Sequence, residues 1–241
     1  MVWTAGAIGV FEPVEGLEDK LRDFSYTRKA HHLTTGKPFH LKSVIHLDSP
    51  QVELSGKSRL LSGIVHSEYI YSPQKLAEDK HGVYQLVDGE PQVDVTYGKF
   101  WLTTKAVVNI VVAERAKTRE FTFNVLSQAI AKNNNHCQPI TMDVNRIARD
   151  YDKHWISGMH ERHGMLQAGT FYGDSLEREP LLRSEYKGWN KNQVGFVTDY
   201  FGSPTKVRVT NGGTVMVLRD LSNQMQEFIN FVRNELLEYA T

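Results

Sequence analysis

Residues 99–130 read KFWLTTKAVVNIVVAERAKTREFTFNVLSQAI, and residues 206–237 read KVRVTNGGTVMVLRDLSNQMQEFINFVRNELL. The two stretches align without a gap at an offset of 107 residues. They share six identities, Lys99/Lys206, Thr103/Thr210, Val108/Val215, Glu120/Glu227, Phe121/Phe228 and Val125/Val232. Both also keep one order of elements, which is a strand, a short polar link, a second strand and a helix. Because self-similarity over a long period indicates repeated structural units, the sequence predicts an α+β fold of two similar halves.

The boundary between the halves is expected at the polar run Lys132–His136, which gives units at 1–135 and 136–241, or one continuous domain. Each unit would carry antiparallel strands backed by its C-terminal helix, near 119–132 in the first and 222–240 in the second. The chain has 241 residues and a mass of 27.5 kDa, enough to bury a substantial core in either arrangement.

Hydrophobic periodicity and turn residues predict the remaining elements. Helices are expected at 16–32, 119–132, 143–163 and 222–240, the second capped by Thr118 and the last by Ser222. A hairpin is expected between 84–87 and 93–97, because Asp88-Gly89 favours a tight turn. The last helix has the clearest apolar stripe. Its members are Met225, Phe228, Ile229, Val232, Leu236 and Tyr239. Other strands are expected at 2–11, 44–47, 59–71, 99–103, 106–113, 194–201, 206–210 and 215–218.

The composition indicates an ordinary globular protein without an evident polyanion partner. Lysine and arginine total 28, balanced by 28 aspartate and glutamate residues. A protein that grips nucleic acid usually has a basic surplus, because phosphate neutralisation supplies the affinity. Cys137 is the single cysteine, which excludes an internal disulfide and favours a reducing compartment. With no signal-peptide pattern and no apolar run of membrane-spanning length, a cytoplasmic location without membrane contact is expected.

Alternation along the repeated strands assigns their side chains to two faces. If Phe100, Leu102, Val108 and Ile110 face the helices, Val207, Val209, Val215 and Val217 do so as well. The opposite face then carries Lys99, Trp101, Asn109, Lys206, Arg208 and Met216. This second face mixes apolar and basic residues. It is either covered by another layer or subunit, or it is an open concave sheet that binds a partner.

The open alternative is similar to the tandem saddle of the TATA-binding-protein family, which has two halves, one curved sheet and helices on the convex side. The string Val108–Ala113 resembles strands of that family over six residues. The resemblance implies a saddle-like sheet; the basic charge of that family is missing from this chain.

The function expected from the residues is that of a macromolecule-binding or assembly protein. Lys99, Trp101, Asn109, Lys206, Arg208 and Met216 are the expected binding residues, with no cofactor and no metal. Neutral charge favours a protein partner or self-association, and leaves nucleic acid as the other choice.

The alternative is a histidine-dependent or metal-dependent hydrolase or phosphoesterase. His154, His160 and His163 fall within the expected helix 143–163. His32-Leu33-Thr34 fits the H-x-T element of two-histidine phosphoesterases, but no second histidine is followed by Ser or Thr at the same spacing in the other half. Cys137, next to His136, is the only candidate thiol nucleophile.

Overall fold

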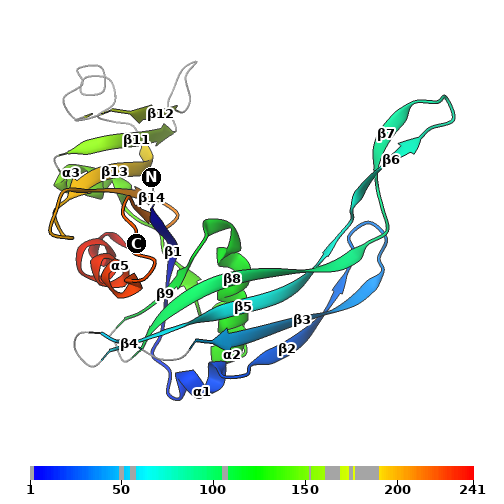
Figure 1. Ribbon diagram of the computed structural model, residues 1–241, viewed down its shortest axis with the longest axis horizontal. Coiled ribbons are helices and arrows are strands. Elements are labelled where there is room, and N and C mark those ends of the chain that lie inside the picture. The colour runs from blue at the N-terminus through cyan, green and yellow to red at the C-terminus, as the bar shows by residue number, and fades with distance from the viewer. Residues whose placement is uncertain are drawn as a thin grey trace.

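The computed structural model describes residues 3–48, 52–54, 58–104, 108–151, 153–160, 169–173, 176 and 190–241. Within these residues the fold is mixed, with one 13-stranded antiparallel sheet, a separate two-stranded hairpin and four helices (Figure 1). The order along the large sheet is β12-β11-β13-β14-β15-β1-β9-β8-β5-β3-β2, with β10 paired to β1 and β4 paired to β5.

The strands and helices have the following bounds. The strands are β1 (Thr4–Phe11), β2 (Ser25–His31), β3 (Pro38–Leu47), β4 (Val52–Glu53), β5 (Arg59–Tyr71), β6 (Gln74–Glu78), β7 (Tyr84–Asp88), β8 (Gln92–Thr104), β9 (Asn109–Ala113), β10 (Gln138–Pro139), β11 (His154–His160), β12 (Gly169–Tyr172), β13 (Asn190–Thr198), β14 (Thr205–Thr210) and β15 (Thr214–Val217). The helices are α1 (Leu17–Leu21), α2 (Arg119–Ala131), α3 (Val144–Asp150) and α5 (Met225–Phe231). A π-helical turn at Val232–Leu236 and a 3-10 turn at Leu237–Tyr239 extend α5.

The first strand, β1, lies in the middle of the sheet and joins its two parts. It pairs with β9 on one side, where Ala7 lies opposite Ala113, and with β15 on the other, where Gly6 lies opposite Val215. The strand pairs β8–β9 and β14–β15 therefore flank β1, and each pair precedes a helix in the sequence.

Two hydrophobic cores lie on opposite faces of this sheet. Ala7 belongs to the core that contains Phe123 and Leu126 of α2, whereas its neighbour Ile8 belongs to the core that contains Phe228 of α5. The residues of β9 alternate in the same way: Ile110 and Val112 pack with α5, and Val111 and Ala113 pack with α2. Because successive residues of a strand point to opposite faces, α2 and α5 cover opposite sides.

This placement corrects the saddle-like arrangement, in which both helices back one face. Phe100 and Leu102 of β8 face α2, but Ile110 and the valines of β14 and β15 face α5. The sequence pattern gives the alternation within each strand. It does not say which of the two sides the following helix will cover, and that choice depends on how the strand pairs meet at β1.

The strands β5 and β8 form a long arm. They pair along their full length, from Arg59 opposite Thr104 to Tyr71 opposite Gln92, and β3 and β2 continue the sheet on the β5 side. Beyond the arm, the hairpin β6–β7 projects away from the rest of the molecule (Figure 1). Its turn contains Gly82, whose positive φ of 77° suits glycine.

Several elements differ from their sequence predictions. Segment 16–32 is the short helix α1 followed by β2, and Asp23 between them takes a left-handed φ of 53°. Among the described residues of segment 143–163, the helix is α3 and residues 154–160 form β11. The hairpin expected around Asp88-Gly89 is wrong, because β7 pairs with β6 and β8 pairs with β5.

The two expected helix caps are also wrong. The Thr118 hydroxyl donates to the carbonyl oxygen of Arg115, three residues earlier, and caps no helical N–H. The Ser222 hydroxyl donates to Asp220, and α5 begins at Met225. The apolar stripe of the last segment is confirmed, since all six of its members are buried.

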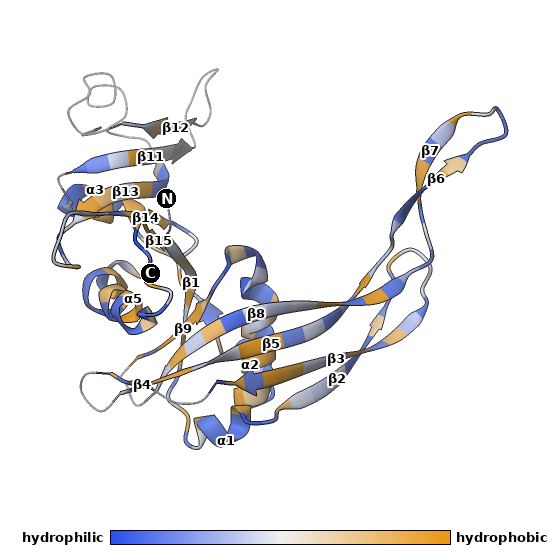
Figure 2. Cartoon of the chain, in the orientation of Figure 1, coloured by the Kyte–Doolittle hydropathy of each residue, from blue (hydrophilic) through white to orange (hydrophobic). Residues whose placement is uncertain are grey.

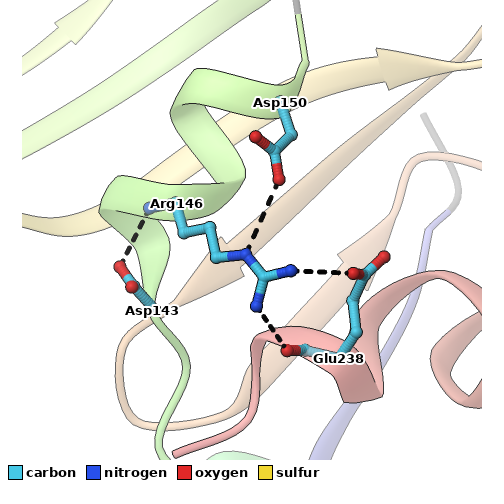
Figure 3. Close-up of polar contacts among 4 residues, drawn as sticks. All are labelled: Asp143, Arg146, Asp150 and Glu238. Carbon is cyan, nitrogen blue, oxygen red and sulfur yellow. Dashed lines mark hydrogen bonds and ion pairs between the residues drawn. The ribbon is translucent and has the colours of Figure 1, made fainter.

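The C-terminal turn is fastened to α3 through Arg146 (Figure 3). Its Nη1 donates to the carbonyl oxygen of Glu238 and its Nη2 to the Glu238 carboxylate, both at 2.9 Å. Its Nε lies 3.8 Å from Asp150, while Asp143 accepts the Arg146 backbone N–H at 2.9 Å as the cap of α3. These bonds hold the C-terminal turn against α3 beside the α5 core. None of the helices in the described residues is long and apolar enough to cross a membrane.

Candidate functional site

The six predicted binding residues do not form one surface. Lys99 and Trp101 alternate with Phe100 and Leu102, so they lie on the face of β8 turned away from α2. Lys206, Arg208 and Met216 alternate with valines that pack against α5, so they lie on the face of β14 and β15 turned away from α5. These two faces are opposite sides of the sheet.

Asn109 belongs to neither surface. It is only 2% exposed and lies opposite Phe11 of β1, a member of the α2 core. Met216 and Arg208 face each other across β14 and β15, and both are half-buried. The Lys206 ammonium lies 5.6 Å from the centre of the Trp155 ring, and the Trp155 indole N–H donates to the carbonyl oxygen of Val207. Lys206 is thus already engaged within its own part of the sheet.

The side of β3, β5 and β8 turned away from α2 forms what we call the open face. In Figure 1 these strands pass in front of α2, so the open face is turned towards the viewer. On β8 it carries Val93, Val95 and Tyr97, which are 42%, 53% and 53% exposed. Three exposed apolar side chains in alternate positions of one strand are unusual where a sheet faces only water.

A row of rings crosses the open face from strand to strand. His46 of β3 and His66 of β5 have their ring centres 5.5 Å apart in an edge-to-face arrangement. His66 lies opposite Tyr97 of β8, and the centres of these rings are 6.3 Å apart. The three rings are held by three neighbouring strands of a continuous hydrogen-bonded ladder, so their backbone positions are fixed before any ligand arrives.

Charged side chains surround this row. Lys99 lies opposite Ile64, two residue pairs along the ladder from the His66–Tyr97 pair, and Lys42 of β3 is exposed on the other side of the row. Asp48 and Glu68 are the carboxylates on this face. Asp48 accepts a hydrogen bond from the Ser62 hydroxyl, and Glu68 accepts the Lys42 backbone N–H at 2.6 Å. Each carboxylate thus already accepts a hydrogen bond, whereas the two ammonium groups extend from exposed positions.

Trp101 marks the inner end of the open face. It is half-buried and packs against the α5 core, while Leu60, two residues before Ser62 on β5, is a member of that core. The α5 core therefore covers the inner end of the open face at Leu60 and Trp101. Lys99, the next residue of β8 on this face, is exposed. From Lys99 outwards the side chains of β8 on this face are exposed.

The histidines named for the hydrolase alternative do not come together in the described part of the chain. His32 forms hydrogen bonds of 3.1 Å to the Thr35 hydroxyl and 3.0 Å to the Ser72 hydroxyl, which tie the β2–β3 turn to the end of β5. His154 and His160 lie on the strand β11, and His163 lies outside the described residues. No cluster of three or more potential metal ligands occurs in the part of the chain that the structure describes.

Cys137 is placed as a core residue. It is 3% exposed, and its backbone N–H donates to the Ser127 hydroxyl at 2.7 Å. Burial raises the pKa of the thiol to about 12, against a smaller opposing effect of the hydrogen bond with Ser127. Because the thiolate is the nucleophilic form, a thiol held neutral in this way is poorly suited to catalysis.

His46, His66 and Tyr97 are not among the binding residues predicted from the sequence. The signal for Tyr97 was present, since Val93, Val95 and Tyr97 alternate with polar residues. The same alternation predicts a hairpin between 93–97 and 84–87, whereas in the structure these residues of β8 pair with β5. No local pattern links His46 to His66, because their contact depends on the register of β3 with β5.

No protein-family model matches the chain, and no curated protein matches it either.

Proposed function

We propose that this protein binds single-stranded nucleic acid on the open face of β3, β5 and β8. The observation that carries the proposal is the row of His46, His66 and Tyr97 rings beside exposed lysines. Single strands are bound by aromatic rings that stack on bases and by cations that neutralise the backbone. Both kinds of group occur here side by side on a rigid sheet.

Local charge supports this partner in spite of the neutral total. Residues 24–47, which include β2 and β3, contain Arg28, Lys29, Lys37 and Lys42 and no aspartate or glutamate. A phosphate backbone that leaves the ring row towards β2 would pass the Glu68 carboxylate beside Lys42 and then meet a segment that has cations and no carboxylate.

The test is a titration of labelled single-stranded DNA and RNA of about 12 nucleotides, followed by fluorescence anisotropy at roughly 50 and 200 mM salt. We expect binding that weakens at the higher salt concentration. Replacing Tyr97 by alanine should lower the affinity about 5- to 150-fold, the equivalent of roughly 1–3 kcal/mol for one stacked base.

Tyr172→Ala is the matched control, because Tyr172 is a 70% exposed tyrosine on the far edge strand β12. It should bind as the unaltered protein does. Equal losses in the two variants, or an anisotropy that stays flat for both DNA and RNA, would exclude nucleic acid as the ligand of the open face and would favour a protein partner.

The internal repeat also stays a proposal. It is supported by the shared order of elements, since β8, β9 and α2 follow one another as β14, β15 and α5 do. Two units on either side of β1, with their helices on opposite faces, would be related by a rotation about an axis along β1. The boundary between residues 135 and 136 and the cytoplasmic location likewise stay predictions.

A further inference from the structure

The hairpin β6–β7 presents an apolar face that is exposed among the described residues. Leu76 lies directly opposite Leu86, and Glu78 lies opposite Tyr84, so these side chains share one side of the hairpin. Leu76, Tyr84 and Leu86 are 68%, 65% and 64% exposed. Figure 2 shows hydrophobic residues on this hairpin, far from both cores.

Such a hairpin has little to hold it in place by itself. A two-stranded sheet without a packed face is at best marginally stable in water. The base of the hairpin is closed by the Gly89 N–H, which donates to the carbonyl oxygen of Pro73 at 2.7 Å. Exposed apolar residues grouped on a projecting element are typical of a surface that is buried in an assembly.

The charges of the hairpin are opposite to those of another part of the arm. The hairpin itself, residues 74–88, contains two lysines and three carboxylates, a net charge of −1, and the continuation to residue 94 at the start of β8 adds two more carboxylates. Residues 24–47 contain four cations and no carboxylate, a net charge of +4 with histidines neutral. In the described part of the chain, none of the charged residues in these two segments takes part in an ion pair.

The basic segment also offers an unpaired sheet edge. β2 is the last strand in the order of the large sheet and pairs only with β3 among the described strands. An exposed edge strand presents free backbone N–H and C=O groups to a further strand. Beside this edge, Tyr26, Ala30 and Phe39 are half-buried on the side that faces α2.

From these observations we infer that the protein self-associates, with the β6–β7 hairpin of one copy docked on the β2–β3 hairpin of a second copy. The occupant is a second copy because one chain carries both the acidic, apolar projection and the basic edge that complements it. In a two-fold dimer each copy gives its hairpin and receives that of its partner. The contact buries Leu76, Tyr84 and Leu86 and brings Glu78 and Asp88 to the edge strand β2, which carries Arg28 on one face and Lys29 on the other.

The test is a charge-reversal experiment followed by sedimentation velocity. The unaltered protein should sediment with at least twice the 27.5 kDa mass of the chain at low salt and dissociate as salt is raised. The double variant Glu78→Lys/Asp88→Lys and the double variant Arg28→Glu/Lys29→Glu should each sediment as a monomer. An equimolar mixture of the two should associate again, because each hairpin then meets an edge of opposite charge.

A separate pair of variants tests the apolar part of the contact. Tyr84→Ser should weaken self-association at least tenfold, while Tyr172→Ser, a change of the same residue at similar exposure on β12, should leave it unaltered. Circular dichroism checks that every variant keeps its fold. A monomeric unaltered protein at low salt, or a mixture of the two charge-reversed variants that stays monomeric, would overturn the inference.

Discussion

Tyr97 and Phe100 lie only three positions apart on β8, yet one is 53% exposed and the other is fully buried. An odd separation along a strand sends the two side chains to opposite faces, and here one face is covered by α2 and the other is open. The same rule separates Lys99 and Trp101 from their neighbours in the α2 core. The role of a residue in this sheet therefore depends on its position in the alternation and on which helix covers its side.

Lys99 and Lys206 occupy equivalent positions of the sequence repeat but lie on opposite faces of the sheet. We expect Lys99→Glu to lower the affinity for single-stranded nucleic acid and to reduce the salt dependence by about 0.7 in the logarithmic slope, the value for one lost phosphate contact. Lys206→Glu is the matched control and should leave both quantities unchanged. Anisotropy titrations over a range of salt concentrations measure the slopes, and equal effects of the two substitutions would contradict the assignment of the open face.

Cys137 gives a second prediction at this scale. Since burial raises its thiol pKa to about 12, the folded protein should react with iodoacetamide far more slowly than the unfolded chain, even at mildly alkaline pH. The free energy of unfolding should also fall as the pH rises from about 9 to about 12, because only the unfolded thiol ionises in this range. Mass spectrometry of the alkylated protein measures the rate, and rapid modification of the native chain would show that the thiol is accessible.

Individual elements differ in how well the sequence predicted them. The stripe Met225–Tyr239 was predicted correctly because its apolar spacing depends on the segment alone, even though its end is a π-helical turn followed by a 3-10 turn. β2 was not predicted, because it is an edge strand whose residues are mostly exposed and show no apolar alternation. β6 was missed for the same reason. Local patterns report burial, and these strands bury almost nothing in their own chain.

Two glycines of β1 test the claim that both of its faces are packed. A Cβ atom at Gly6 would overlap Cγ1 of Val112 on the α5 side, and a Cβ atom at Gly9 would come within 2.6 Å of the Gln138 carbonyl oxygen beside Phe123 of α2. Gly6→Ala and Gly9→Ala should each lower the free energy of unfolding by about 1–3 kcal/mol through overpacking.

Gly169→Ala is the control for these two variants. Its Cβ atom would lie 3.5 Å from the Phe171 ring, an ordinary contact, on the edge strand β12. Its stability should change by less than about 0.5 kcal/mol. Urea unfolding of the three variants measures the changes, and a neutral result at either Gly6 or Gly9 would show that one face of β1 is open.

On the scale of the whole molecule, the zero net charge hides an uneven distribution of charge, and the sheet topology brings together strands that are distant in the sequence. The chain has zero formal net charge, but residues 24–47 carry four cations and no carboxylate, and residues 74–94 carry five carboxylates against two lysines. The sequence repeat indicated which strands and helices follow one another. It could not indicate that β1 would enter between the two strand pairs, because that placement joins residues more than 200 positions apart. The faces covered by α2 and α5 follow from this placement, and with them the position of the open face.

The most direct measurement of the central claim is ultraviolet crosslinking of a bound single-stranded oligonucleotide, with the modified peptides identified by mass spectrometry. We predict crosslinks to His66, Tyr97 and Trp101, the rings on or beside the open face. Crosslinks confined to β14 and β15, or an oligonucleotide that crosslinks to no described part of the arm, would contradict the account.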